Sequence, residues 1–218
     1  GAMDAVRAHM RDNDLKVGDN LPGEGHFAAS LGVSRAVIRE AFGALAALGQ
    51  IDVGNGRVAR VGAIDGSVMA SALDHAVATA QVSPGQIWEV RRTLETRAAE
   101  LAARNRTDAE AAAIAGLASA MRGAADQLDE LTRLDVAFHQ AVAQATHNPL
   151  LWQIVRSFAP IMATAVPAAW QTRTGVSERE TMLERHGGVA RAIESRDEAA
   201  ALRAMNEHFD DAVGDLLN

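Results

Sequence analysis

Four polar side chains in the second half of the sequence could together hold a metal ion. Asp135 and His139 are four residues apart and so project from one face of a helix, while His186 and His208 lie on two later helical segments. Neutral imidazole suits Zn, Ni, Cu or Fe, and a carboxylate adds negative charge while coordination positions stay open. A histidine taken alone is more often a surface or core residue, so spacing leaves both interpretations open. We assign that plainer role to the other histidines, His9, His26, His75 and His147.

Two arginines in the first quarter of the sequence could contact nucleic acid. Arg35 and Arg39 are four residues apart in a segment whose apolar residues recur every three or four positions, which predicts a helix with both arginines on its solvent face. Its apolar stripe comprises Val37, Ile38, Ala41, Phe42, Leu45 and Leu48. Arginine can bond phosphate oxygens or the O6/N7 edge of guanine. Two solvated arginines on an amphipathic surface helix explain this segment equally well.

The segments around this helix favour the DNA-binding interpretation. A short apolar helix ends at Leu31, Gly32 lets the chain leave it, and Ser34 is a good N-cap for the next helix, which predicts a helix-turn-helix. Residues 51–53 and 57–61 then flank a glycine-rich turn at 54–56, which predicts a two-stranded wing. Arg57 and Arg60 on the wing are candidate phosphate contacts.

Almost everything after residue 62 has a helical pattern. A linker is expected at 62–67 and a connecting helix at 68–81, and Pro167 is expected to kink or end one of the later helices. Those later helices are predicted at 87–103, 108–124, 128–146, 149–159 with a continuation past Pro160, 178–195 and 197–217. The predicted fold class is mainly α: a winged helix-turn-helix domain (1–62), a linker and connecting helix (63–82), and an all-α bundle of about six helices (83–218).

Composition agrees with this architecture. The chain has 218 residues, of which 48% are apolar and only 4% aromatic, which favours an alanine-rich helical body over a sheet sandwich. It contains no cysteine and no run of about 18 apolar residues, so we expect a soluble cytoplasmic protein without membrane contact. The net charge is −7, yet residues 1–62 carry seven basic and seven acidic side chains. DNA binding by this neutral part must therefore depend on geometry and dimerisation.

The first 62 residues resemble the winged N-terminal domain of the GntR regulators. The resemblance is carried by residues 21–24, 31–35, 37–42, 45–49 and 54–56. It implies that Arg35 and Arg39, with Ser34, contact operator DNA and that the turn with Asn55, Gly56 and Arg57 lays the wing along the minor groove. The chain departs from the family in one place, because the usual Ser-Glu-Arg after the Leu-Pro pair is replaced by Gly23, Glu24 and Gly25. The arginine missing at Gly25 usually contacts DNA, so we expect weaker or altered operator binding.

The rest of the chain resembles the FCD effector domain of the FadR subfamily. The matching motifs lie at 89–95, 98–103, 135–139, 148–151, 184–186 and 201–209. The resemblance implies a divalent metal, Zn, Ni or similar, held by Asp135, His139, His186 and His208, with Arg91 facing the same cavity to meet a ligand carboxylate. Because the metal motif is intact, a small carboxylate fits better than an acyl-CoA. An ion pair with Glu95, four residues away, is the alternative role for Arg91.

These expectations define a transcription regulator rather than an enzyme. A small organic acid would bind the metal and Arg91 and change operator binding by a homodimer whose interface we cannot assign, most simply as a repressor. A metal-dependent hydrolase or lyase is the main alternative, although the sequence offers no obvious spare general base. A bundle with a purely structural metal is another. The sequence leaves open the effector, the operator, the metal used in the cell and the sign of regulation.

Overall fold

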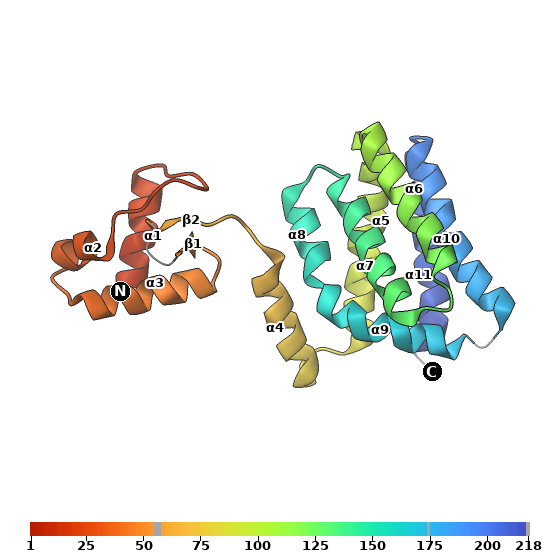
Figure 1. Cartoon of the computed structure of the whole chain (residues 1–218), viewed down its shortest axis with the longest axis horizontal. Coiled ribbons are helices and arrows are strands. Elements are labelled where there is room, and N and C mark those ends of the chain that lie inside the picture. Colours follow the sequence, from red (N-terminus) through yellow and green to blue (C-terminus); the bar gives the residue numbers. More distant parts are fainter. Residues whose placement is uncertain (55–57, 174, 217–218) are drawn as a thin grey trace. The chain divides into compact units, whose positions relative to one another are not determined.

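In the computed structural model, the described residues 1–54, 58–173 and 175–216 form two compact units, Gly1–Val68 and Met69–Asn218 (Figure 1). The boundary between them lies within the predicted connecting segment. The first unit contains α1 (Ala2–Asp12), α2 (Glu24–Leu31), α3 (Arg35–Ala47), β1 (Ile51–Asp52) and β2 (Arg60–Val61). Both α1 and α2 pack on α3. Their apolar faces share one small core built from Val6, Leu21, Phe27, Ile38, Phe42, Leu45 and Ile51.

The predicted helix-turn-helix is formed by α2 and α3. Gly32 has a φ of 65°, the left-handed conformation that ends α2 and that glycine adopts without strain. Ser34 is the N-cap of α3, and its side chain accepts a hydrogen bond from the Val37 backbone N–H. The predicted apolar stripe is wrong at its edges, because Val37 and Leu48 are 43% and 44% exposed. The core takes up only the narrower central part of the stripe, so these two side chains face solvent.

The wing is shorter than predicted. β1 and β2 pair antiparallel, with Ile51 opposite Val61 and Asp52 opposite Arg60. The predicted strands at 51–53 and 57–61 are therefore reduced to two residues each. Gly62 follows β2 where only a glycine fits, since a Cβ there would lie 2.4 Å from the Gly49 carbonyl oxygen. The predicted contacts Asn55, Gly56 and Arg57 lie outside the described residues.

The second unit is built from helices, and α4 is the first of them along the sequence. Their bounds are α4 (Gly66–Ala78), α5 (Pro84–Asn105), α6 (Asp108–Gly123), α7 (Leu128–Gln144), α8 (Pro149–Ser157), α9 (Ala159–Thr172), α10 (Val176–Glu194) and α11 (Glu198–Leu216). Local signals set several starts: Ser83 with Gln86 and Thr107 with Glu110 form capping boxes, and Asn148 caps α8. The predicted bundle is confirmed. The segment expected as one helix through Pro160 is instead two, because α8 ends at Ser157 and α9 follows Phe158.

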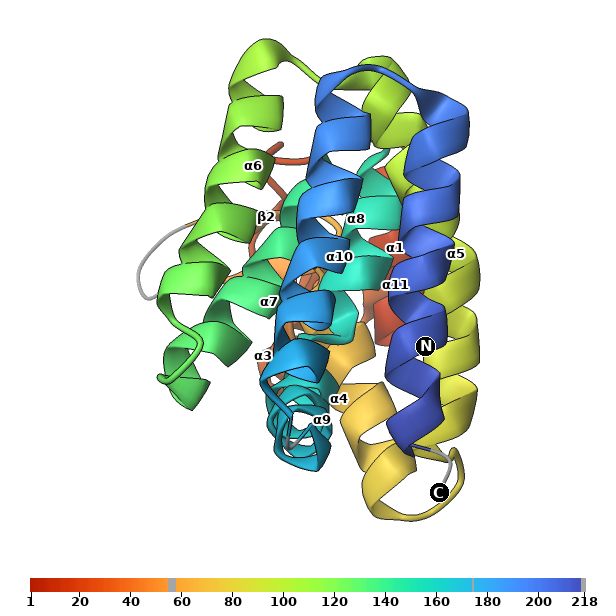
Figure 2. The same cartoon turned by 90° about the vertical axis from the view of Figure 1, so that its right-hand side faces the viewer.

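The bundle brings α5, α7, α10 and α11 together around one core. α5 packs against α11 and α7, and α10 packs against α11 and α6. Figure 2 shows α10 between α6 and α11, with α5 on the other side of α11. The buried stretch of α5 is made of Ala98, Ala99, Ala102 and Ala103. Methyl side chains let neighbouring helices approach closely, which fits the low aromatic content of the sequence.

Pro167 does not end a helix as predicted. It lies inside α9, which continues to Thr172. Proline at this position leaves the carbonyl of Ala163 without its helical partner, but Ala163 is exposed, so water can bond that oxygen. Burial of Met162, Val166 and Trp170 keeps the helix packed. Among the described residues, none of the helices is both long and apolar enough to cross a membrane.

Candidate functional site

The four predicted metal ligands meet inside the helical unit. Asp135 and His139 come from α7, His186 from α10 and His208 from α11, and all four side chains are buried. A ring nitrogen of each histidine lies within 4.8 Å of one from each of the other two. Asp135 Oδ1 lies 3.1 Å from His186 Nε2. The structure therefore brings together every residue of the predicted ligand set.

Neighbouring groups fix how two of these imidazoles are oriented. His186 Nδ1 lies 2.9 Å from the carbonyl oxygen of Met182, to which only an N–H can donate, so Nε2 is the nitrogen left facing Asp135. His139 Nδ1 makes a short contact with Glu95 Oε2. Phe138 packs edge-on against the rings of both histidines. Such partners hold a histidine in one orientation, as the outer shell of a metal site does.

Electrostatics set the protonation states of two members. Burial by itself would raise the pKa of Asp135, but the hydrogen bond with His186 and the positive charges of His139, His186 and Arg91 outweigh it and lower the pKa to about 2. Burial, reinforced by the charges of nearby histidines and arginines, lowers the pKa of His208 well below its ordinary value. Near neutral pH Asp135 is therefore ionised and His208 is neutral, the forms that bind a metal.

Arg91 forms the ion pair that the sequence offered as its alternative role, and its side chain also faces the cavity, where the effector-binding role stays a prediction. Its Nε lies 2.7 Å from Glu95 Oε1 in a buried ion pair, and its side chain also lines the cavity. Burial would raise the pKa of Glu95, but the charges of Arg91 and His139 overcome it and lower that pKa. Sequence reasoning considered Glu95 only as a partner for Arg91. Its contact with His139 across two helices has no signal in the sequence.

The cavity is small and lined by both polar and flexible apolar side chains. Its volume is about 30 Å³, room for about one water. Besides Arg91, Asp135, His139 and His208, its walls are formed by Trp88, Met162, Val166, Ala169, Arg173, Met182 and Arg185. Arg173 is buried, and its charge contributes to the lowered pKa of His208. Sequence reasoning missed Arg173, which only the fold brings to this place from the end of α9.

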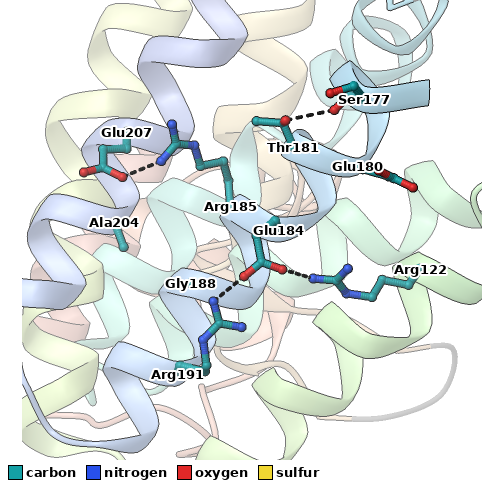
Figure 3. A pocket seen from close by; sticks show the side chains of 10 residues that line it. All are labelled: Arg122, Ser177, Glu180, Thr181, Glu184, Arg185, Gly188, Arg191, Ala204 and Glu207. Carbon is teal, nitrogen blue, oxygen red and sulfur yellow. Dashed lines mark hydrogen bonds and ion pairs between the residues drawn. The ribbon is translucent and has the colours of Figure 1, made fainter. Parts of the chain in front are cut away.

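A larger groove of about 640 Å³ lies beside α10 (Figure 3). Five of its charged side chains pair with one another: Glu184 contacts Arg122 and Arg191, and Arg185 contacts Glu207. These pairs are exposed and contribute little to stability. Arg185 lines both this groove and the buried cavity. The groove is thus charge-balanced, and the histidines and buried arginines belong to the cavity.

The helix-turn-helix presents its predicted contact residues to solvent. Ser34, Arg35 and Arg39 are all exposed. Arg39 is paired with Glu24 of α2, with 3.2 Å between Nη2 and Oε2. On the wing, Arg60 Nε donates to Asn20 Oδ1 at 3.1 Å. Glu24 and Asn20, which sequence reasoning did not connect to the site, therefore orient two of its arginines.

The glycine that departs from the family pattern lies under one of these arginines. A Cβ at Gly25 would be 3.2 Å from Arg35 Nη2, so the end of the Arg35 side chain occupies the space that a larger residue would need. Because that end is flexible, it can shift at low cost. An arginine at position 25, which the family resemblance leads one to expect, would therefore move the end of the Arg35 side chain from its present position.

A winged helix-turn-helix unit joined to an all-helical unit defines a two-domain DNA-binding regulator of transcription. Comparison with protein families agrees: residues 1–61 match "Bacterial regulatory proteins, gntR family" and residues 86–211 match the FCD domain. The chain belongs to the GntR family and carries an FCD domain, the FadR-type combination expected from the sequence.

Curated relatives support this assignment over nearly the whole chain. The Glc operon transcriptional activator of Escherichia coli (strain K12) is 30% identical over 211 residues, which cover 94% of this chain and 83% of that protein. The transcriptional regulator LutR of Bacillus subtilis (strain 168) is 28% identical, with 96% of both chains covered. The transcriptional repressor NanR of Citrobacter rodentium (strain ICC168) is 29% identical, with 92% and 78% covered. These relatives are regulators, so this chain is not an enzyme and the hydrolase or lyase alternative is set aside.

Solved structures share the fold. Streptococcus agalactiae GntR aligns with a TM-score of 0.64 at 24% identity, covering 96% of each chain. E. coli McbR/YncC aligns with a TM-score of 0.54 at 18% identity, covering 99% of this chain and 95% of that one. At these identities the likeness concerns architecture alone.

Proposed function

We propose that this protein is an effector-responsive regulator whose helical unit binds a divalent metal ion and a small organic acid. Binding of the acid changes the affinity of the winged unit for operator DNA. The protein acts in the cytoplasm as a homodimer, because one winged unit makes few base contacts and operators with two-fold symmetry require a matching protein. Among the relatives, one is named an activator and another a repressor, so the family leaves the sign of regulation open. We propose repression.

The observation that carries the metal proposal is the pairing of His186 with Asp135. Because His186 Nδ1 donates to a carbonyl, a neutral His186 directs a lone pair from Nε2 toward the carboxylate oxygen 3.1 Å away. Two lone pairs at this distance need a proton or a cation between them. Adjacent ligands of an ion bound at about 2.1 Å lie roughly 3.0–3.4 Å apart, which matches this spacing.

The rest of the donor set fits the same ion. His208 Nδ1 is buried and has no hydrogen-bond partner among the described residues. Glu95 holds His139 by Nδ1, which leaves Nε2 free for coordination. We therefore propose that Asp135, His139, His186 and His208 hold the metal. When bound, the ion supplies positive charge and open positions for an acid oxygen.

Arg91 is placed to take the carboxylate of the acid. Its Nε is held by Glu95, while its Nη1 faces the thioether sulfur of Met162. A thioether is a weak acceptor, so a carboxylate oxygen would displace it. The cavity must widen to admit an acid, and the flexible side chains of Met162 and Met182 in its wall allow this.

Apolar packing connects the cavity to the segment that leads to the wing. Met162 and Val166 of α9 line the cavity and also belong to an apolar cluster that contains Leu73 and Val77 of α4. A ligand that moves Met162 therefore changes the surface on which α4 rests. We therefore propose that α4 transmits effector binding to the winged unit. A ligand shifts an equilibrium only through a difference in affinity between two states, so the acid must bind one arrangement of α4 more tightly than another.

The test measures DNA affinity, by fluorescence anisotropy, on a duplex selected in vitro from random sequences. Small organic acids are titrated into metal-loaded protein, and metal content is measured by mass spectrometry. We expect at least one acid to change DNA affinity by about 5- to 150-fold. His186→Ala should abolish the response, and His75→Ala, a change at an exposed histidine of α4, should keep it. Absence of any response, with a lower melting temperature on chelation, would instead make the metal purely structural.

A further inference from the structure

Trp88, one of the residues that line the cavity, carries a buried polar group that neither the proposed metal ligands nor Arg91 uses, the indole N–H. Trp88 Nε1 is buried and has no hydrogen-bond partner among the residues that the structure describes. Nearly all buried donors in folded proteins are paired, and an unpaired one loses its hydration without compensation. Trp88 lies on α5, three residues before Arg91, and both side chains line the same cavity.

The ring that carries this donor is held in place. The Arg91 guanidinium carbon lies 5.0 Å from the centre of the Trp88 ring, and the Phe209 ring packs edge-on against it at 5.2 Å. These contacts fix the ring through its faces and edges, and none of them uses the N–H. The donor is therefore preorganised, which lowers the entropic cost of binding a partner.

Any hydrogen-bond partner of the Trp88 N–H must be an acceptor. The indole N–H, like the guanidinium groups of Arg91 and Arg173, donates hydrogen bonds and cannot accept them. We propose that Trp88 is a specificity-determining residue that donates its Nε1–H to an oxygen of the bound acid. The effector is then an oxyacid with an acceptor oxygen beyond those that meet Arg91 and the metal, as in a hydroxy acid or a diacid. This inference rests on the proposed effector site.

The test compares Trp88→Phe with Trp152→Phe. Phenylalanine keeps an aromatic ring against Arg91 and Phe209 but removes the N–H, and Trp152 is a partly buried tryptophan of α8 outside the cavity wall. The probes are lactate, malate and succinate, with alanine and aspartate as analogues in which an ammonium replaces the hydroxyl. Affinities are measured by calorimetry on metal-loaded protein. We expect Trp88→Phe to weaken binding of the best acid about tenfold, Trp152→Phe to leave it unchanged, and the amino acids to bind more weakly.

A second readout keeps the result independent of folding defects. In protein with ¹⁵N-labelled tryptophan, the Trp88 indole resonance should move downfield when the acid binds, while those of Trp152 and Trp170 stay in place. Equal acid affinity in Trp88→Phe, or an unmoved indole resonance, would overturn this inference alone. Failure of every acid to bind the unmodified protein would overturn the proposed function and this inference together.

Discussion

Glu24 pairs with Arg39, one of the two arginines of α3 that are predicted to contact DNA. Its pair with Arg39 is at the surface, where Arg39 is 72% exposed and Glu24 is 31% exposed, so the pair itself contributes little to stability. If Arg39 contacts DNA as predicted, a carboxylate beside it both competes for the guanidinium and repels phosphate, so the pair should weaken DNA binding. Arg35 has a different neighbour, Gly25, which adds no charge.

We predict that Glu24→Gln tightens operator binding by about two- to tenfold at low salt. The change removes one negative charge and frees Arg39 for phosphate, so the slope of affinity against salt concentration should steepen by about one unit. Fluorescence anisotropy across a salt series measures both quantities. Glu40→Gln, an equal charge change on the exposed face of α3, is the control. If both variants behave alike, the Glu24–Arg39 pair has no specific role.

Glu95 is the residue on which the buried polar cluster depends. It contacts both Arg91 and His139 and is only 1% exposed. Neutralising one member of a buried ion pair leaves the other charge uncompensated, at a cost of about 3–5 kcal/mol. We therefore predict that Glu95→Gln lowers the free energy of unfolding by about 3 kcal/mol, measured by urea denaturation.

The matched control is Glu100→Gln on the same helix, where the glutamate is only partly buried and pairs with the half-exposed Arg97. Its effect should stay below about 1 kcal/mol. Glu95→Gln should also weaken metal binding about 10- to 100-fold, because Glu95 orients His139. A Glu95→Gln protein as stable as the control would mean that this buried pair contributes no net stability.

At the scale of elements, α6 begins with a capping box. The Thr107 hydroxyl accepts from the Glu110 backbone N–H, and Glu110 accepts from the Thr107 backbone N–H at 2.7 Å. We predict that Thr107→Ala costs about 1 kcal/mol of unfolding free energy. Thr181→Ala, at an exposed position inside α10, should be neutral or slightly stabilising, because alanine is the best helix former. Chemical denaturation of the two variants checks the difference.

The sequence predicts the elements with such local signals, and apolar spacing alone predicts α7, whose N-cap Gln127 makes no side-chain hydrogen bond. Ser34, Ser83, Thr107 and Asn148 mark helix starts through bonds to residues two or three positions away. Of the two effects expected at Pro167, a kink or a helix end, the helix end does not occur, because a proline can stay inside a helix where the carbonyl four residues earlier can reach water, a property of packing.

The candidate site likewise contains some residues that the sequence predicts and others that it does not. The four proposed metal ligands lie in segments that resemble a known domain, and Asp135 and His139 share a helix face by spacing alone. Trp88, Glu95 and Arg173 take their roles from contacts between helices that are distant in the sequence. A single sequence contains no local pattern for such contacts.

At the scale of the whole molecule, buried carboxylates determine how stability depends on pH. The pKa of Asp135 falls from 3.8 to about 2 on folding, and that of Glu95 falls below 4.5. A lowered folded-state pKa means that stabilisation is fully present above the unfolded value and is lost as pH falls through the folded value. We predict that the unfolding free energy of the helical unit falls between about pH 4.5 and pH 2.

Urea denaturation followed by circular dichroism across this pH range is the measurement. Asp135→Asn should reduce the pH dependence, because the amide does not titrate. Asp129→Asn, a change at an exposed position on the same helix, should leave the profile unchanged. A profile for Asp135→Asn that follows the unmodified protein would assign the acid sensitivity to other groups.

The buried alanines of α5 affect the proposed ligand site although none of them belongs to it. Ala98, Ala99, Ala102 and Ala103 are almost completely buried in the core of the bundle. α5 packs directly against α7, α10 and α11, which carry the carboxylate and the imidazoles. An added methylene in such a core displaces its neighbours. Exchanges among small apolar residues in this seam would therefore shift α7, α10 and α11 slightly, and so adjust the shape of the proposed ligand site, without replacing any of the four proposed metal ligands.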